Sequence, residues 1–96
     1  MSEQMLQTIR DYFASQPVQR AWLFGSFARG EEREDSDVDI LVDFDENVGL
    51  LQHIHMMNEL QDLLCRDVDL VTNGTLVPAA EKTANRDKRI IYERAD

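Results

Sequence analysis

The sequence contains a single cysteine, Cys65, among its 96 residues. One cysteine excludes an internal disulfide and any cysteine-based zinc cluster. No apolar run approaches the ~18–20 residues that a membrane-spanning helix needs. The first residues, MSEQMLQTIRDYF, lack the basic start and the apolar stretch of a secretory signal peptide. These absences predict a cytoplasmic protein that does not insert into a membrane.

Basic residues are scarce, since ten Lys and Arg face nineteen Asp and Glu and the net charge is −9. This balance argues against direct binding to a nucleic-acid backbone. The excess is local, because residues 31–46 hold nine acids and one Arg while the remaining residues are nearly balanced. Such a block is usually a solvated loop that attracts cations. Here, however, the strand-like pattern VDILVDF runs through it.

The composition is otherwise that of a globular protein, with 43% hydrophobic and 30% charged residues. The length predicts one domain, residues 1–96. Hydrophobic periodicity and turn residues predict helices and strands in alternation. The predicted helices run from a Ser2 cap to before Pro17, briefly over 26–30, over 49–65 and over about 78–86. The predicted strands cover 18–24, 38–44 and 68–72, with a turn at Asn73-Gly74, and 89–93 is an edge strand or the end of the last helix. This order predicts an α/β (α+β) fold, a small mixed sheet covered by helices.

The candidate site begins with Gly25-Ser26, and ten residues separate this pair from Asp37-Val38-Asp39. Residues two apart in a strand point to the same face, so Asp37 and Asp39 would project side by side, roughly 6.5–7 Å apart. Two such carboxylates repel each other unless a cation holds them. Oxygen ligands select Mg²⁺ or Mn²⁺. Asp69, inside the strand-like VDLV, is a third candidate ligand, although Asp67 shares its face by alternation.

Gly25-Ser26 also has the features of a phosphate-binding turn. A glycine permits close approach of a ligand to the backbone, and the start of a helix favours an anion. Arg29, one turn further on, could reach a phosphate oxygen or form a surface salt bridge to Glu32. A phosphate turn facing metal-binding carboxylates describes a nucleoside triphosphate site that serves phosphoryl or nucleotidyl transfer.

The run GSFARGEEREDSDVDILVDF, followed by VDLV at 68–71, closely resembles the minimal nucleotidyltransferases (MNT proteins) of the DNA-polymerase-β-like superfamily. The resemblance covers nearly the whole chain. It implies that Gly25 and Ser26 hold the triphosphate of ATP, with Arg29 and Ser36 as further nucleotide ligands. It also implies that Asp37 and Asp39 hold two Mg²⁺ ions, for which Mn²⁺ can substitute. Asp69 would complete the catalytic metal site and help to activate the attacking hydroxyl.

The same resemblance implies a role in a HEPN/MNT toxin–antitoxin system. Members of this family act as antitoxins of HEPN-domain RNase toxins and transfer AMP from ATP to a tyrosine of the toxin. Three other functions stay open at this point. The protein could neutralise a toxin by binding alone, modify a small molecule as an adenylyltransferase, or mimic nucleic acid through its acidic surface.

Several other polar or reactive residues have simpler explanations. Asp43 and Asp45 continue the strand alternation, but solvation explains them best. His53 and His55 point to different faces of a helix, so they form no metal pair and are expected at the surface or at a partner. Cys65 is expected as a small buried hydrophobe. The apolar residues of the 49–65 helix are expected to share one face: Leu50, Ile54, Met57, Leu60 and Leu64.

Overall fold

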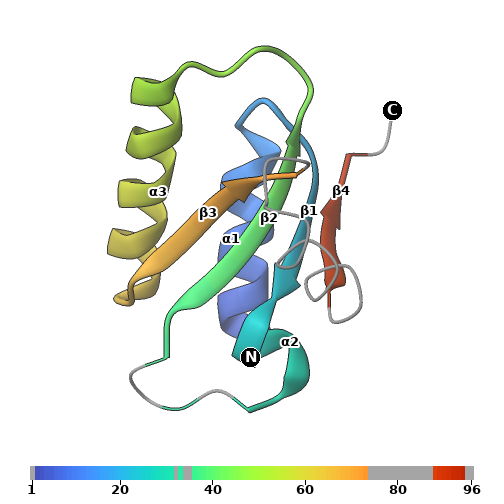
Figure 1. Ribbon diagram of the computed structural model, residues 1–96, viewed down its shortest axis with the longest axis vertical. Coiled ribbons are helices and arrows are strands. Elements are labelled where there is room, and N and C mark those ends of the chain that lie inside the picture. The colour runs from blue at the N-terminus through green and yellow to red at the C-terminus, as the bar shows by residue number, and fades with distance from the viewer. Residues whose placement is uncertain (1, 32, 34–35, 74–87, 95–96) are drawn as a thin grey trace.

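The protein is built around a four-stranded sheet with the strand order β3-β2-β1-β4 (Figure 1). The computed structural model describes residues 2–31, 33, 36–73 and 88–94. Along the chain the elements are α1 (Glu3–Ala14), β1 (Val18–Phe24), α2 (Gly25–Arg29), β2 (Val38–Phe44), α3 (Leu50–Leu64), β3 (Val68–Thr72) and β4 (Arg89–Glu93). Strand β1 pairs antiparallel with β2 and β4, whereas β2 and β3 are parallel. The predicted mixed sheet covered by helices is therefore confirmed.

Most predicted boundaries agree with these elements to within a residue or two. Of the two alternatives for residues 89–93, the edge strand is correct. The helix predicted at about 78–86 lies outside the described residues, as does Gly74 of the predicted turn. Among the residues that are described, no helix is long and apolar enough to cross a membrane.

Helix α1 begins where the sequence places a cap. The hydroxyl of Ser2 accepts a hydrogen bond from the Met5 N–H at 3.2 Å, which satisfies one of the free amides of the first turn. Ile9 and Phe13, one turn apart, are fully buried against the sheet and α3. The helix ends at Ala14, before Pro17.

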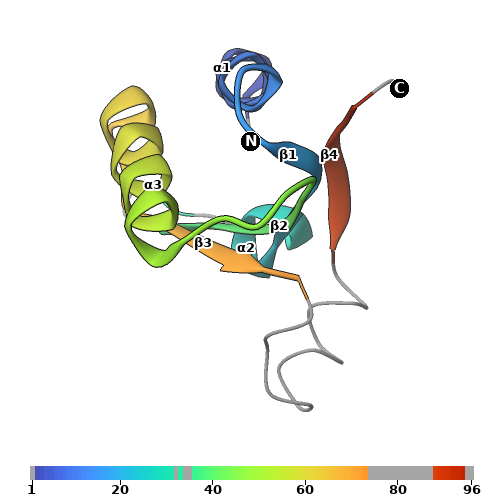
Figure 2. The same ribbon diagram turned by 90° about the horizontal axis from the view of Figure 1, so that it is seen from above.

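One face of the sheet packs against α1 and α3, and the opposite face carries the acidic side chains. Figure 2 shows both helices on the same side of the strands. Val38, Ile40 and Val42 of β2 are fully buried in this core. Because side chains alternate along a strand, Asp39 and Asp43 must point to the other face.

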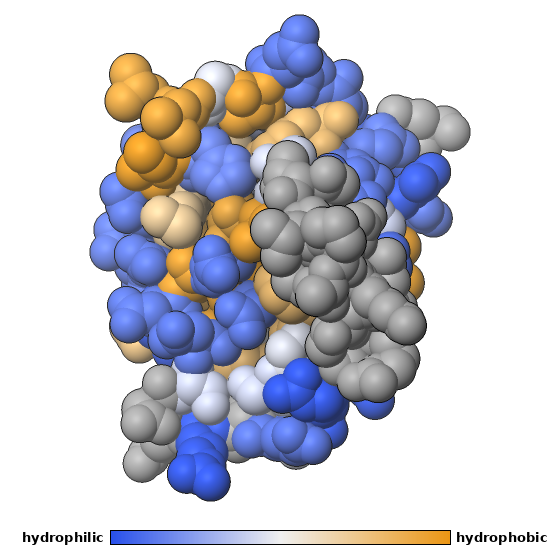
Figure 3. Space-filling view, viewed as in Figure 1, coloured by the Kyte–Doolittle hydropathy of each residue, from blue (hydrophilic) through white to orange (hydrophobic). Residues whose placement is uncertain are grey.

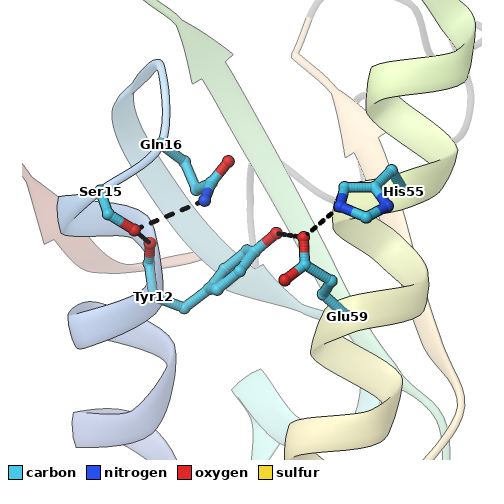
Figure 4. Close-up of polar contacts among 5 residues, drawn as sticks. All are labelled: Tyr12, Ser15, Gln16, His55 and Glu59. Carbon is cyan, nitrogen blue, oxygen red and sulfur yellow. Dashed lines mark hydrogen bonds and ion pairs between the residues drawn. The ribbon is translucent and has the colours of Figure 1, made fainter.

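A polar contact joins the two helices above the sheet (Figure 4). The Tyr12 hydroxyl of α1 donates to Glu59 Oε1 of α3 at 3.1 Å, and His55 Nε2 lies 2.6 Å from the same oxygen. Burial and the neighbouring Glu59 carboxylate raise the pKa of Tyr12 well above its usual range. The hydroxyl therefore stays protonated and keeps its role as a donor.

Of two expectations about α3 and its end, one is partly wrong and the other is wrong. Leu60 is buried, and Met57 and Leu64 pack against the core as expected. Met56 and Leu60 form the buried face of α3, while Leu50 and Ile54 are 74% and 39% exposed. The helix is thus rotated so that its first apolar residues lie at the margin of the buried face. Cys65 is exposed, because it ends the helix in the left-handed conformation with φ 54° instead of pointing into the core.

Candidate active site

The carboxylate of Asp39 lies directly against the backbone of Gly25. A Cβ atom at residue 25 would come within 2.3 Å of Asp39 Oδ2, a distance that real Cβ atoms do not reach. Gly25 also has φ +70°, in the left-handed region that favours glycine. Glycine is therefore required here for two independent reasons, the backbone conformation and the space that Asp39 occupies. This contact brings together the two halves of the motif, which are far apart in the sequence.

The register of the sheet places Asp69 beside Asp39. In the parallel pairing of β2 with β3, Asp39 is opposite Asp69, while on its other side Asp39 is opposite Phe24, which precedes Gly25. Neighbouring strands lie about 4.8 Å apart, so these two carboxylates share one small region of the sheet face. Asp69 is exposed, whereas Val68 and Leu70 on either side of it are buried. It therefore lies on the face opposite to α3.

The pKa of Asp39 is raised because its carboxyl is partly buried and lies near other acids. Burial, and then the negative charges of Asp69 and Asp37, raise the pKa of Asp39 to about 6, while the Arg29 charge opposes the shift. Asp67 is not among the causes. Asp67, just before β3, and Asp69 share a face by alternation, and the register and the charge coupling both favour Asp69 as the acid that faces the site.

Two carboxylates that repel each other fit a hard divalent cation. Mg²⁺ is commonly held by one or two carboxylates and completes its shell with water and substrate phosphate oxygens. The Asp39–Asp69 pair, with Asp37 exposed just before β2, offers such an oxygen-only donor set. In the part of the chain that the structure describes, no three His, Cys, Asp or Glu side chains are grouped so that they could hold a metal ion by themselves. The donor set therefore fits a metal that is shared with a phosphate ligand.

The candidate nucleotide ligands lie around this pair. Ser26 is the second residue of α2, whose capping residue Phe24 makes no side-chain hydrogen bond to the helix start. Arg29 forms an ion pair with Glu31, Nε to Oε2 at 3.2 Å, and its charge also acts on Asp39. The Ser36 hydroxyl accepts a hydrogen bond from the Arg33 N–H at 2.7 Å, which shapes the backbone just before Asp37. Figure 1 shows α2 and the starts of β2 and β3 at the same end of the molecule.

Asp43, Asp45 and the two histidines have partners elsewhere in the fold. Asp43 accepts a hydrogen bond from Asn73 Nδ2 at 3.1 Å, and Asp45 pairs with Arg94. His53, which was expected at the surface or at a partner, instead makes a hydrogen bond to the Leu70 carbonyl inside the fold. His55 is largely exposed, as expected.

The sequence did not point to Arg66. A single arginine between a helix and a strand has the pattern of an ordinary surface residue, and only the folded chain shows that it reaches the residues before Asp37.

Paired acids on adjacent strands, facing a Gly-Ser turn at the end of the neighbouring strand, define the nucleotidyltransferase class of site. The chain belongs to the family described as polymerase beta, nucleotidyltransferase, whose model matches residues 7–96. It is 47% identical over 75 residues to the protein adenylyltransferase MntA of Thermococcus cleftensis, a match that covers 78% of this chain and 74% of that protein.

Solved structures share the fold at lower identity. A toxin–antitoxin crystal structure with AMP-PNP matches with a TM-score of 0.81 at 21% identity, covering 93% of this chain and 73% of that one. A complex of a tri-AMPylated Shewanella oneidensis HEPN toxin with an MNT antitoxin matches with a TM-score of 0.77 at 19% identity. That match covers 98% of this chain and 74% of the other. Both likenesses support the polymerase-β-like fold.

Proposed function

We propose that this protein is an antitoxin that transfers AMP from ATP to a tyrosine hydroxyl of a HEPN-family RNase toxin and so neutralises it. The contact of Asp39 with Gly25, next to Asp69, carries this proposal, because it joins a metal-binding acid to a phosphate-binding turn. The name of the Thermococcus cleftensis relative and the AMPylated toxin in a complex of the same fold support protein as the acceptor. We place the protein in the cytoplasm, because ATP and its toxin partner are expected there. We treat residues 1–96 as one domain.

Each candidate residue has a defined part in this reaction. We assign the triphosphate to Gly25 and Ser26, with Arg29 and Ser36 beside it. Asp37, Asp39 and Asp69 would hold two Mg²⁺ ions, or Mn²⁺ in their place, which neutralise phosphate charge when bound. The acceptor oxygen forms a bond to the α-phosphorus, and the bond from that phosphorus to the bridging oxygen breaks. Pyrophosphate leaves with the electron pair, and the hydroxyl proton passes to the Asp69 carboxylate.

An exposed apolar patch is available for a protein partner. Leu50 and Leu51, at the start of α3, are 74% and 84% exposed, and Ile54 lies one turn further on. Figure 3 shows this patch as orange side chains at the upper left, over the N-terminal turns of α3. Contiguous apolar surface of this kind commonly marks a protein interface. Because the patch and α2 lie at opposite ends of the molecule (Figure 1), binding and transfer should be separable.

The test is transfer of labelled AMP to the co-expressed toxin. Each transferred AMP adds about 329 Da to the toxin, which intact-mass spectrometry resolves. Asp37→Asn and Asp39→Asn each remove a charged ligand with little change in size, so both variants should bind the toxin and leave its mass unchanged. Asp43→Asn, on the same strand and with the same loss of charge, is the matched control and should transfer AMP as the parent does.

Cell protection separates catalysis from simple binding. If the Asp37→Asn/Asp39→Asn double variant protects cells from the toxin as fully as the parent, neutralisation occurs by binding alone and the enzymatic proposal is wrong. If the parent labels a small molecule but no toxin, the acceptor is not a protein.

A further inference from the structure

The guanidinium of Arg66, between α3 and β3, binds the backbone just before Asp37, about thirty residues earlier in the sequence. Arg66 lies between α3 and β3 and is half-buried. Its Nη1 donates hydrogen bonds to the carbonyl of Arg33 at 3.2 Å and to that of Ser36 at 3.1 Å. The Ser36 carbonyl belongs to the peptide that leads into Asp37. Arg66 thus holds the backbone at the point where the first acid of the site begins.

The same guanidinium also contacts the other half of the motif. Arg66 Cζ lies 5.3 Å from the centroid of the Phe27 ring, in a cation–π arrangement. Phe27 is only 5% exposed and directly follows Ser26 in α2. One side chain therefore links the Gly-Ser turn to the residues that precede Asp37.

The residues that flank Arg66 are hydrogen-bonded to neighbouring elements. The next residue, Asp67, accepts a hydrogen bond through its carbonyl from the Val38 N–H at 2.9 Å. Gln61 of α3 accepts one from the Val68 N–H at 3.1 Å. With Asp37 and Asp67, Arg66 also lines a hollow of about 410 Å³. Movement of Asp37 relative to β3 must therefore break contacts of Arg66.

A lysine can replace only part of this set of contacts. Arginine presents several donors in a planar fork and stacks its flat face on an aromatic ring, whereas lysine is a flexible point charge. Nη1 makes both carbonyl contacts while Cζ lies over the Phe27 ring, so one guanidinium serves the backbone and the ring at the same time.

We propose that Arg66 is a positioning residue for AMP transfer, which holds Asp37 in place for metal binding; this rests on the function proposed above. It acts through the backbone before Asp37 and through α2, without contact with the nucleotide. Loss of such a supporting contact typically lowers metal affinity or activity about 10- to 100-fold.

The experiment compares Arg66→Met and Arg66→Lys with Arg10→Met. Arg10 is a matched control, since its Nε donates to the Ile91 carbonyl at 2.8 Å on β4, away from the acids. Mn²⁺ affinity is measured from the free-ion signal in electron paramagnetic resonance, and kcat and the KM for ATP are measured for AMP transfer. We expect Arg66→Met to weaken Mn²⁺ binding and lower kcat, each about 10- to 100-fold, with the ATP KM within about threefold. Arg66→Lys should recover part of both losses, and Arg10→Met should match the parent in both.

Several outcomes would overturn the proposal. If folded Arg66→Met has parental Mn²⁺ affinity and kcat, the residue only stabilises the fold. A raised ATP KM with unchanged Mn²⁺ affinity would make Arg66 a direct nucleotide ligand. Should Arg66→Met fail to fold, Arg66→Lys decides, and parental values there reject the proposal. A parent that transfers no AMP rejects the proposed function, while the Mn²⁺ comparison still tests Arg66.

Discussion

At residue 25, the Asp39 carboxylate occupies the space that a side chain would fill, and the backbone has φ +70°. Gly30, five residues on, has nearly the same conformation, φ +71°, but no atom lies within 4 Å of the position that its Cβ would take. Alanine at either position therefore tests backbone strain, and alanine at residue 25 alone also tests displacement of the Asp39 carboxylate.

We predict that Gly25→Ala and Gly30→Ala each lower the free energy of unfolding by about 1 kcal/mol, because alanine resists positive φ. Only Gly25→Ala should also lower AMP transfer, by about 100-fold or more, because it displaces Asp39. Urea unfolding and transfer rates measure the two effects. Equal activity of the two variants would show that the contact between Gly25 and Asp39 does not matter for catalysis.

Asp39 makes the stability of the nucleotide-free protein depend on pH. Its pKa is raised to about 6, whereas an unfolded aspartate titrates near ~3.9. Between these values the folded protein holds a proton that the unfolded chain has released, so stability falls as pH rises through this window. Above about pH 6 the folded protein carries the full cost of the charge.

We therefore predict that Asp39→Asn raises the melting temperature at pH 7.5 by about 5 °C, or about 1 kcal/mol after allowance for solvent screening. At pH 4 the gain should nearly vanish, because the parent carboxyl is then protonated in the folded state. Asp43→Asn, the control on the same strand, should show no such pH-dependent gain. Thermal melts at both pH values decide the matter, and a gain that is independent of pH would contradict the assigned cause.

Among the elements, α3 connects the parallel strands β2 and β3, so its packing determines how β3 lies beside β2. His53 fastens the helix to β3: its ring nitrogen hydrogen-bonds the Leu70 carbonyl, and the ring meets Phe44 edge-on with centroids 5.9 Å apart. Leu70 is adjacent to Asp69. The position of this acid therefore depends on how α3 is seated.

We predict that His53→Ala lowers the free energy of unfolding by about 1–2 kcal/mol, since it removes a half-buried hydrogen bond and a ring contact. His55→Ala, two residues along the same helix, should change it by no more than about 0.5 kcal/mol, because that ring is 72% exposed. Urea titrations with unchanged m-values measure the difference. Equal effects of the two variants would show that His53 does not fasten α3 to β3.

For the whole molecule, the clustered acids predict that a divalent ion with ATP stabilises the fold. Ligand at about 100 times its dissociation constant contributes about 2.7 kcal/mol, which raises the melting temperature of a domain of this size by roughly 10 °C or more. Scanning fluorimetry with Mn²⁺ and ATP together should show this shift in the parent and in Asp43→Asn. The Asp37→Asn/Asp39→Asn double variant should show little of it. A parent that is indifferent to millimolar Mn²⁺-ATP would count against the nucleotide site.

The sequence by itself predicted most of the described helices and strands, because their causes are local, and it left only 89–93 open between a strand and a helix end. Ser2 caps α1, Pro17 prevents its continuation, and the alternation in VDILVDF sets which side chains of β2 face the core. The same alternation predicts that Asp37 and Asp39 share one face, although β2 itself begins only at Val38.

Tertiary structure decided everything that joins distant segments. The register that sets Asp69 beside Asp39, and the approach of Asp39 to Gly25, both depend on how the sheet is assembled. The reach of Arg66 to the Ser36 carbonyl follows from the same assembly. The burial of α3 through Met56 and Leu60, with Leu50 left exposed, is likewise decided by packing. Strand register and helix rotation minimise the free energy of the whole core, and no local pattern contains that information.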